Sequence, residues 1–269
     1  MIDRGKVRQA FGRGAAEYDT HAVVQKRVIA RFVELLKRED LAPRRLLDIG
    51  AGTGVLLRSL RELYGHADAV GIDLSIGMSR TARENLAANG SEFILTADAE
   101  QLPFVGASFD LALSTSTFQW LVDLKTAFGE VFRVLAPGGA FCFALFGGQT
   151  LHELRTSYRL ALTAAGCQWE DRSHTFFTEN EVTEALTWAG FGGCRVVTEF
   201  DVEMHDNVPS LLRSLKRIGA GSASPITLRG LAGKRVMLDM METYRREFSR
   251  PLGMPATYEV LYGVARKNG

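Results

Sequence analysis

The residues best suited to bind a nucleotide-like ligand lie at positions 46–54, which read Leu-Leu-Asp-Ile-Gly-Ala-Gly-Thr-Gly. An apolar run ends in Asp48, and Gly50, Gly52 and Gly54 follow at alternate positions. Glycine has no Cβ atom, so such a loop can turn tightly and let a ligand approach the backbone. An apolar strand, a glycine loop and a helix N-terminus together predict a nucleotide-binding corner.

The glycine spacing argues against a dinucleotide as the ligand. Dinucleotide-binding loops space their glycines as G-x-G-x-x-G, whereas here the third glycine comes one residue earlier. Asp48 also faces the loop with a carboxylate. A carboxylate in this place suits a ligand with a cationic amino-acid end and no phosphate.

Further acidic residues follow the next two predicted strands. Asp73 lies roughly 20–25 residues beyond the loop, the spacing at which a carboxylate holds a ribose diol. Asp98 follows the third strand and could accept a hydrogen bond from an adenine amino group. A lone acidic residue after a strand is often a helix cap or a turn former. In order along successive strands, however, these residues predict S-adenosylmethionine binding. The predicted cofactor-binding residues are Asp48, Gly50, Ala51, Gly52, Gly54, Asp73, Leu74, Asp98, Ala99, Glu100 and Ser114.

Alternating strands and helices must position these residues. Apolar runs predict strands at 44–49, 68–73, 91–95, 109–114 and 140–146, with helices at 54–64, 75–88 and 124–135 between them. This alternation predicts an α/β fold with a doubly wound parallel sheet, whose crevice lies at the carboxyl ends of its strands.

The flanking segments are expected to cover that crevice. Residues 1–38, 151–165 and 179–189 look helical, and strands are predicted at 194–202 and 257–266. We expect a single domain over 1–269, with a cofactor-binding core at 40–147. The helical segments 1–38 and 204–252 are then an N-terminal lid and a cap insertion.

Bulk properties favour a cytoplasmic protein. A net charge of +1 gives no strong electrostatic attraction to nucleic acid or to a membrane. The N-terminus lacks the apolar core of a signal peptide, and no apolar run is long enough to span a bilayer. Cys142, Cys167 and Cys194 read as reduced core thiols. The five histidines show no metal-ligand spacing, so no metal site is expected.

The core motifs resemble one large family. Asp48 to Gly54, Asp73, Asp98 and the run Arg133-Val-Leu-Ala-Pro-Gly-Gly139 are similar to the seven-stranded S-adenosylmethionine-dependent methyltransferases. The resemblance covers roughly residues 40–147. It implies a Rossmann-like, mostly parallel seven-stranded sheet and S-adenosylmethionine as cofactor, and it says little about the methyl acceptor.

The flanks resemble a narrower family over nearly the whole chain. Segments 11–22, 116–120, 212–220 and 257–263 are similar to the malonyl-[acyl-carrier protein] O-methyltransferases of biotin synthesis. Arg217 is a departure, since some relatives have glycine there. The resemblance implies malonyl-acyl carrier protein as partner. It also implies methyl transfer to the free malonyl carboxylate, giving the ester that primes pimeloyl and biotin synthesis.

Such a reaction needs positioning rather than a base. A carboxylate is already an anionic nucleophile, so no general base is required, and alignment with the methyl donor would carry the catalysis. Tyr18, Gln119 and Trp120 are the candidate positioning residues, although the aromatic side chains could equally be packed in the core. Gly12 and Gly14 could serve as hinges of the lid or simply end a helix.

Cations on the predicted helix 208–218 are the candidates for substrate and carrier binding. Arg213, Lys216 and Arg217 lie opposite its apolar side chains. They could pair with the malonyl carboxylate or the carrier's phosphate and steer an acidic carrier, or they could form an ordinary solvated face. The weaker candidates are Arg155, Arg159 and Arg172.

Two other functions fit parts of the pattern. A methyltransferase for a small molecule, such as a quinone precursor or another carboxylic acid, would have the same core. A dinucleotide-dependent oxidoreductase, or a binding module that lost activity, would share the fold. The glycine spacing and Asp48 argue against the dinucleotide, and the intact loop argues against an inactive module.

Overall fold

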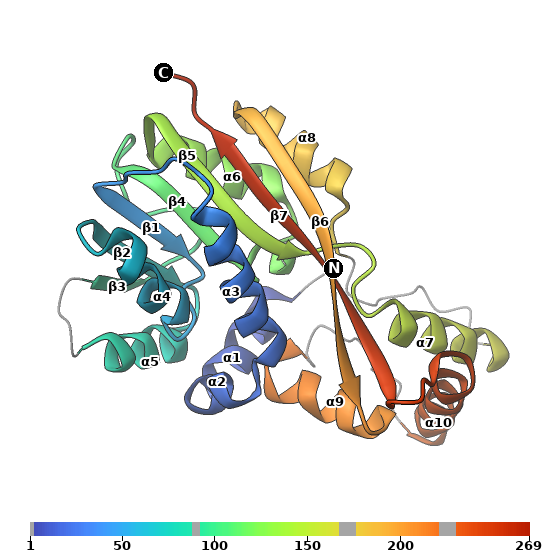
Figure 1. Ribbon diagram of the computed structural model, residues 1–269. Coiled ribbons are helices and arrows are strands. Elements are labelled where there is room, and N and C mark those ends of the chain that lie inside the picture. Colours follow the sequence, from blue (N-terminus) through green and yellow to red (C-terminus); the bar gives the residue numbers. More distant parts are fainter. Residues whose placement is uncertain (1–2, 88–91, 167–175, 221–229) are drawn as a thin grey trace.

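A twisted seven-stranded sheet forms the centre of the computed structural model, which describes residues 3–87, 92–166, 176–220 and 230–269 (Figure 1). The strand order is β3-β2-β1-β4-β5-β7-β6. The first five strands pair in parallel, whereas β7 is antiparallel to both β5 and β6. The predicted doubly wound, mostly parallel sheet is therefore confirmed.

The elements follow one another as strands and helices in alternation through the first half of the chain. The strands are β1 Arg45–Ile49, β2 Asp68–Asp73, β3 Glu92–Thr96, β4 Phe109–Thr115, β5 Leu135–Phe146, β6 Gly192–His205 and β7 Met254–Arg266. The helices are α1 Arg4–Gly14, η1 Ala15–Glu17, α2 Tyr18–His21, α3 Val23–Leu36, α4 Val55–Tyr64, α5 Ile76–Leu86, η2 Phe118–Trp120, α6 Leu124–Val134, α7 His152–Ala164, α8 Glu179–Ala189, α9 Val208–Arg217 and α10 Gly230–Phe248.

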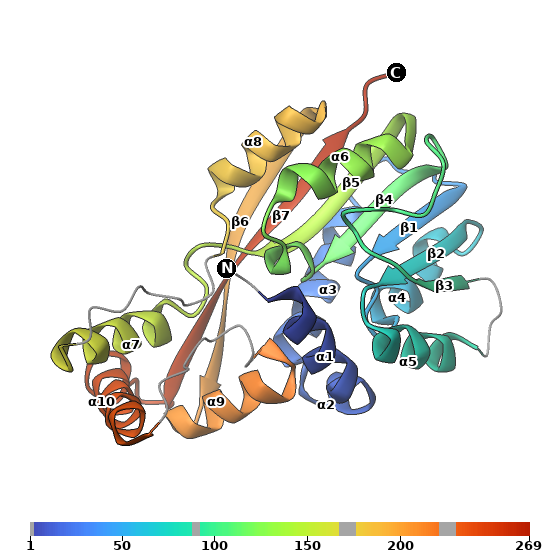
Figure 2. The ribbon, with the colours of Figure 1, turned by 180° about the vertical axis from the view of Figure 1, so that it is seen from behind.

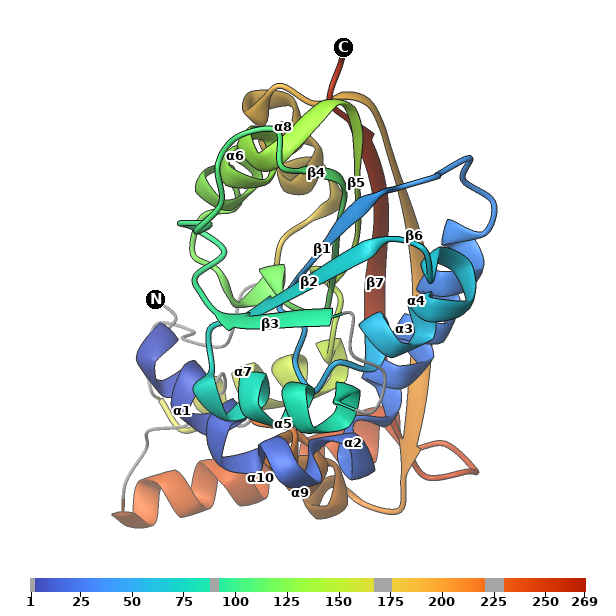
Figure 3. The same ribbon diagram turned by 90° about the vertical axis from the view of Figure 1, so that its left-hand side faces the viewer.

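Helices cover both faces of the sheet, as Figure 3 shows from its edge. Alternate residues of β5 belong to two separate cores, Phe141 and Phe143 to one and Cys142 and Ala144 to the other. Helices α6 and α8 pack on the first face, and α3 and α4 cover the second. A strand buried on both sides explains why these segments read as continuous apolar runs.

Strands β6 and β7 form a long antiparallel pair that runs from Gly192↔Arg266 to His205↔Met254. Both are longer than predicted, because they pair with each other far beyond the rest of the sheet. Helices α7, α9 and α10 gather at the extended end of this pair (Figures 1 and 2). Helices α9 and α10 lie between these two strands in the sequence, within residues 204–252.

The N-terminal segment forms helices that reach across the carboxyl ends of the strands. Helix α3 is tied to β6 by Arg27, which donates to Asp201 at 2.6 and 2.8 Å, and by Arg31, which pairs with Glu199. Helix α1 packs on α5 through two glycines, since a Cβ on Gly77 would lie 2.6 Å from the carbonyl oxygen of Gly12. Gly12 therefore allows close helix packing here rather than a hinge. Gly14 ends α1 within contact distance of α9.

Strand β5 begins at Leu135, earlier than the predicted start at 140. The helix before it ends at Val134, one residue before the predicted end. A Pro-Gly-Gly sequence follows at 137–139, and this sequence is typical of a helix stop rather than of a strand. The strand nevertheless passes through it with an irregular register, pairing Leu135 with Phe109 and then Ala140 with Leu111.

Candidate active site

The glycine loop between β1 and α4 forms the floor of a cavity. All three glycines have positive φ, +76° at Gly50, +55° at Gly52 and +85° at Gly54, a region that favours glycine. Any side chain at position 50 would also collide with a neighbour, because a Cβ on Gly50 would lie 2.0 Å from Oγ1 of Thr117. The amides of Gly50 and Ala51 both donate to the carbonyl of Ile72 at 2.8 Å. The loop is thus held against the end of β2.

Asp73, the last residue of β2, ties this loop to α5. One carboxylate oxygen accepts from the amide of Gly52 at 3.0 Å, and the other accepts from the amide of Ser75 at 2.8 Å. Burial raises the pKa of Asp73 to about 6, while these two amides oppose the shift. A carboxylate oxygen has more than one lone pair, so the group can still accept from a ribose diol.

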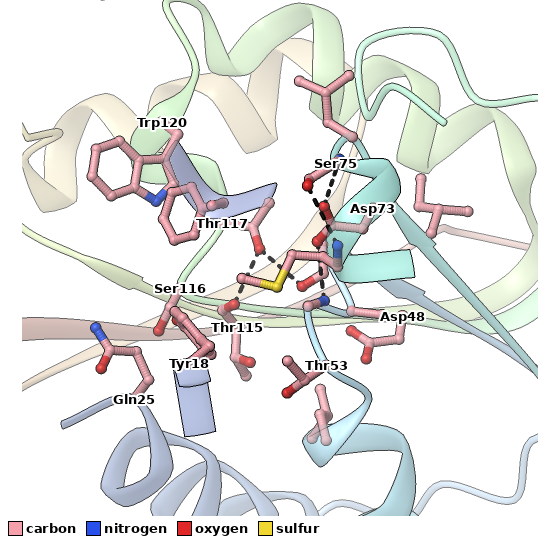
Figure 4. A pocket seen from close by; sticks show the side chains of 18 of the residues that line it. Tyr18, Gln25, Asp48, Thr53, Asp73, Ser75, Thr115, Ser116, Thr117 and Trp120 are labelled. Atoms are coloured by element: carbon pink, nitrogen blue, oxygen red, sulfur yellow. Dashed lines mark hydrogen bonds between the residues drawn. The ribbon is translucent and has the colours of Figure 1, made fainter. Parts of the chain in front are cut away.

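Asp48 is buried at the cavity wall with one oxygen unsatisfied (Figure 4). Its side chain is 1% exposed, and its Oδ2 atom has no hydrogen-bond partner among the described residues. Burial raises the pKa of Asp48 to about 8, and the nearby carboxylate of Asp73 contributes. A buried carboxylate without a partner is costly, so the site fits a ligand that brings a cation.

The segment after β4 forms the opposite wall. Ser116 has a positive φ of +54°, an uncommon conformation for serine. Gln119 steadies this turn, because its Nε2 donates to the carbonyl of Ser116 at 2.7 Å. The hydroxyl of Thr117 donates to the carbonyl of Thr115 at 3.1 Å, and a second contact to Gly50 lies at 3.4 Å. Strain held in place by neighbours is typical of a functional site.

Aromatic side chains from α1, α2 and η2 meet at one side of the cavity. The ring of Phe11 lies 6.1 Å from that of Tyr18 and 5.5 Å from that of Trp120, so α1, α2 and η2 meet there. Burial raises the pKa of Tyr18, and the carboxylates of Asp73 and Asp19 add to the shift. The hydroxyl of Tyr18 is therefore protonated near neutral pH and can donate a hydrogen bond.

Helix α1 is fastened at the far end of the cavity by Arg4. Its guanidinium donates to Asp98 at 2.6 Å and also pairs with Glu100. The Asp98 carboxylate additionally accepts from the backbone amide of Glu100 at 2.9 Å. The two predicted acidic residues thus connect α1 to the loop after β3, and their neighbours Ala97 and Ala99 face the cavity instead.

The structure brings most of the predicted cofactor residues together. Those that line the cavity are Asp48, Gly50, Ala51, Gly52, Asp73, Leu74 and Ala99. Two of the predicted positioning residues, Tyr18 and Trp120, line it as well.

Several other predicted residues lie outside the cavity wall. Ser114 is fully buried and donates to the carbonyl of Ile49 at 2.7 Å, so it joins β4 to β1. Gly54 starts α4 against Leu86, and Gln119 lies behind Ser116. The α9 cations are exposed at the surface and do not reach the wall; they are Arg213, Lys216 and Arg217. Arg172 and Cys167 lie outside the described residues.

The sequence analysis missed several polar residues of the wall. The hydroxyl of Thr53 donates to Asp19 at 2.6 Å, which joins the glycine loop to α2. Gln25 and Lys26 of α3 also face the cavity. Thr53 lies within the recognised loop and could have been found there. The residues of α2 and α3 carry no local signal, because only the chain's return over the sheet brings them to the site.

Neither a metal centre nor a membrane-spanning helix is found in the described part of the chain. No group of three or more histidine, cysteine or acidic side chains is arranged there to hold a metal ion. No described helix combines the length and the apolar character needed to cross a bilayer.

The cavity fits S-adenosylmethionine. A glycine loop turns against Asp73, whose carboxylate could accept from a ribose. The buried carboxylate of Asp48, whose Oδ2 atom has no partner among the described residues, could meet the ammonium group of the methionine part. Residues 47–143 match the family described as methyltransferase domain. A Haemonchus contortus phosphoethanolamine N-methyltransferase, solved with S-adenosylhomocysteine, superposes with a TM-score of 0.57 at 20% identity, covering 89% of this chain and 53% of that one. Fold and site together define an S-adenosylmethionine-dependent methyltransferase.

The relatives narrow the family. A malonyl-[acyl-carrier protein] O-methyltransferase from Geobacter sulfurreducens is 52% identical over 267 residues, covering 99% of this chain and 100% of the relative. One from Halorhodospira halophila is 37% identical, covering 98% of this chain and 88% of the relative. The chain belongs to the malonyl-[acyl-carrier protein] O-methyltransferase family.

Proposed function

We propose that this enzyme transfers a methyl group from S-adenosylmethionine to the free carboxylate of malonyl carried on acyl carrier protein. The full-length similarity to the Geobacter sulfurreducens enzyme, at 52% identity, carries this proposal. The methyl ester would prime pimeloyl and biotin synthesis. The proposal places the enzyme in the cytoplasm, with the carrier protein as partner and neither nucleic acid nor a membrane involved.

The residues of the cavity have distinct roles in this reaction. The cofactor supplies a methyl group activated on a sulfonium sulfur. Asp48 would hold its ammonium group, Asp73 would hold its ribose hydroxyls, and the lining residues after β3 would contact its adenine. The malonyl carboxylate attacks as an anion, so no side chain has to remove a proton. Ordering the two reactants for the reaction costs entropy. Binding of both reactants in the site offsets this cost before the chemical step.

The N-terminal lid would keep water out of the cavity and orient the acceptor carboxylate. Tyr18 donates a hydrogen bond to the acceptor carboxylate, while Phe11 and Trp120 pack across the cavity and keep water away. Removing water strengthens electrostatic attraction within the site. Gln119 acts as a positioning residue, because its amide holds the carbonyl of Ser116 in the wall.

The flanking helices would form the lid and the cap. Helices α1 to α3 would cover the cofactor, and helices α9 and α10 would stand over the route of the acyl arm. The cations Arg213, Lys216 and Arg217 lie exposed on α9, away from the cavity wall. We therefore assign them to attraction of the acidic carrier rather than to contact with the malonyl carboxylate.

Mass spectrometry of the carrier tests the proposal. Malonyl-carrier protein incubated with the enzyme and S-adenosylmethionine should gain the mass of one CH2 group, and S-adenosylhomocysteine should inhibit this gain. Acetyl-carrier protein, which lacks the free carboxylate, should remain unchanged. If malonyl-carrier protein gains no mass while a small carboxylic acid or a quinone precursor is methylated, the assigned acceptor is wrong.

A further inference from the structure

Two surface helices beside the cavity carry cations and no acidic residue. Helix α1 contains Arg4, Lys6, Arg8 and Arg13, and α9 contains Arg213, Lys216 and Arg217. The whole chain has a net charge of only +1, with 32 basic and 31 acidic residues. The basic character of these helices is therefore a local feature of this side of the molecule.

The two helices join into one surface. A Cβ on Gly14 would lie 3.2 Å from the carbonyl oxygen of Arg217, and one on Gly219 would lie 3.3 Å from Phe11. The end of α1 is thus packed against the end of α9, as the ribbon shows from both sides (Figures 1 and 2). The cations of α9 continue those of α1.

Helix α1 has an inner and an outer side. Val7 is buried and Phe11 faces the cavity, whereas Lys6 and Arg13 are exposed. Lys6 and Arg13 are seven residues apart, which places them on the same side, two turns from each other. Arg8 is exposed and also lines the cavity, so it lies at the mouth between the two sides.

Most of these cations have no acidic partner. In the described ranges, no carboxylate lies within ion-pair distance of Arg8, Arg13 or the three α9 cations, whereas Arg4 pairs with Asp98 and Lys6 with Asp3 at 3.2 Å. Unpaired exposed cations raise the local potential and attract an acidic surface.

We infer that the outer side of α1, with Lys6 and Arg13, forms one continuous docking surface with α9 for an acidic carrier protein. Arg8 at the mouth would meet the phosphate of the carrier's prosthetic arm as the arm enters the cavity. This inference rests on the proposed function, since it needs an acidic carrier as partner. An acidic carrier protein fits this surface because the surface is positively charged and lies beside the mouth of the cavity.

Charge reversal on α1 tests the surface. The double variant Lys6→Glu/Arg13→Glu is compared with the wild-type enzyme on malonyl-carrier protein and on the N-acetylcysteamine thioester of malonate, which has no carrier. We expect KM for the carrier to rise about tenfold or more and its salt dependence to flatten. Activity on the small thioester and the Kd for S-adenosylhomocysteine should stay within about twofold, which also shows that the variant is folded.

A matched double reversal controls for the change in net charge. Arg38 and Arg44 are exposed near the start of β1, at the opposite edge of the sheet from the cavity. Arg38→Glu/Arg44→Glu should leave KM for the carrier nearly unchanged. If KM rises equally in both double variants, the rise is caused by the overall charge of the enzyme, and the proposed docking surface is wrong.

The remaining outcomes separate this inference from the proposed function. If the wild-type enzyme methylates malonyl-carrier protein but the α1 variant has an unchanged KM for it, the docking surface is wrong and the function stands. If the wild-type enzyme methylates only the small thioester, both the carrier as acceptor and the surface are wrong.

Discussion

The carboxylate of Asp73 accepts hydrogen bonds from the amides of Gly52 and Ser75, and it is also the group proposed to hold the ribose. We expect Asp73→Ala to weaken S-adenosylhomocysteine binding by about 1–3 kcal/mol, through lost charge-assisted hydrogen bonds. Asp73→Asn, which keeps one acceptor oxygen and replaces the other by an NH2 donor, should lose less than Asp73→Ala. Isothermal titration calorimetry measures both variants. An unchanged affinity in Asp73→Ala would remove this residue from the site.

Asp48 differs from Asp73 because its Oδ2 atom has no hydrogen-bond partner among the described residues. With its pKa raised to about 8, the carboxyl group is mostly protonated at pH 6 in the ligand-free enzyme. Binding of an ammonium group favours the ionised form, so that the proton must leave when the cofactor binds. This link makes cofactor affinity depend on pH.

We expect the Kd for S-adenosylhomocysteine to fall as the pH rises from about 6 to about 8, by at most about tenfold per pH unit. The direction of this change follows from the raised pKa of Asp48. Below this pKa, binding must include the free-energy cost of deprotonating the carboxyl group, whereas above it the group is already ionised. Calorimetry in buffers of different ionisation enthalpy should record proton release near pH 6.5 that disappears in Asp48→Asn. Proton release of the same size in that variant would assign the titration to another group.

At the scale of elements, the contact between α1 and α5 depends on two glycines. Gly77→Ala would place a methyl group 2.6 Å from the carbonyl oxygen and 2.9 Å from the Cα atom of Gly12. Both are backbone atoms, so α1 must shift away from the cavity. We expect the variant to bind S-adenosylhomocysteine about tenfold or more weakly, as measured by calorimetry, because the lid fits less closely.

Gly129 in α6 provides the matched control. It is also a helical glycine, but a Cβ there would meet only Trp188, at 3.7 Å. Gly129→Ala should raise the free energy of unfolding by up to about 1 kcal/mol, since alanine favours the helix, and should leave cofactor affinity unchanged. Equal affinity losses in both variants would mean that the α1–α5 contact has no special role.

The sequence predicted those elements whose residues carry a local signal. The glycine loop, the apolar strands and the capping residues define β1 to β4 and their helices to within one or two residues. Contacts made through space were not predictable. Nothing near Arg4 in the sequence points to Asp98, and nothing near Gln25 points to the glycine loop. The full length of β6 and β7 likewise depends on their pairing with each other rather than on either segment alone.

At the scale of the whole molecule, the lid and the sheet differ in how firmly they are held. Strands β5 and β7 are paired along most of their length and buried on both faces. Helix α1 has a single buried side chain, Val7, and is held by Arg4 at one end and by glycine contacts at the other. Few buried apolar contacts mean that α1 opens locally at low cost in free energy.

Hydrogen exchange should therefore report closure of the lid when the cofactor binds. We expect S-adenosylhomocysteine to slow amide exchange in α1 and in residues 50–54, because opening of the lid then also costs the binding free energy. Helix α8 is the internal control, since it has the same length of 11 residues and packs on the far face against α6. Its fraying amides should exchange at the same rate with and without ligand. Arg4→Met, which removes the ion pairs to Asp98 and Glu100, should lose most of the protection in α1. Exchange in α1 that does not respond to the ligand would mean that this helix does not close over the cofactor.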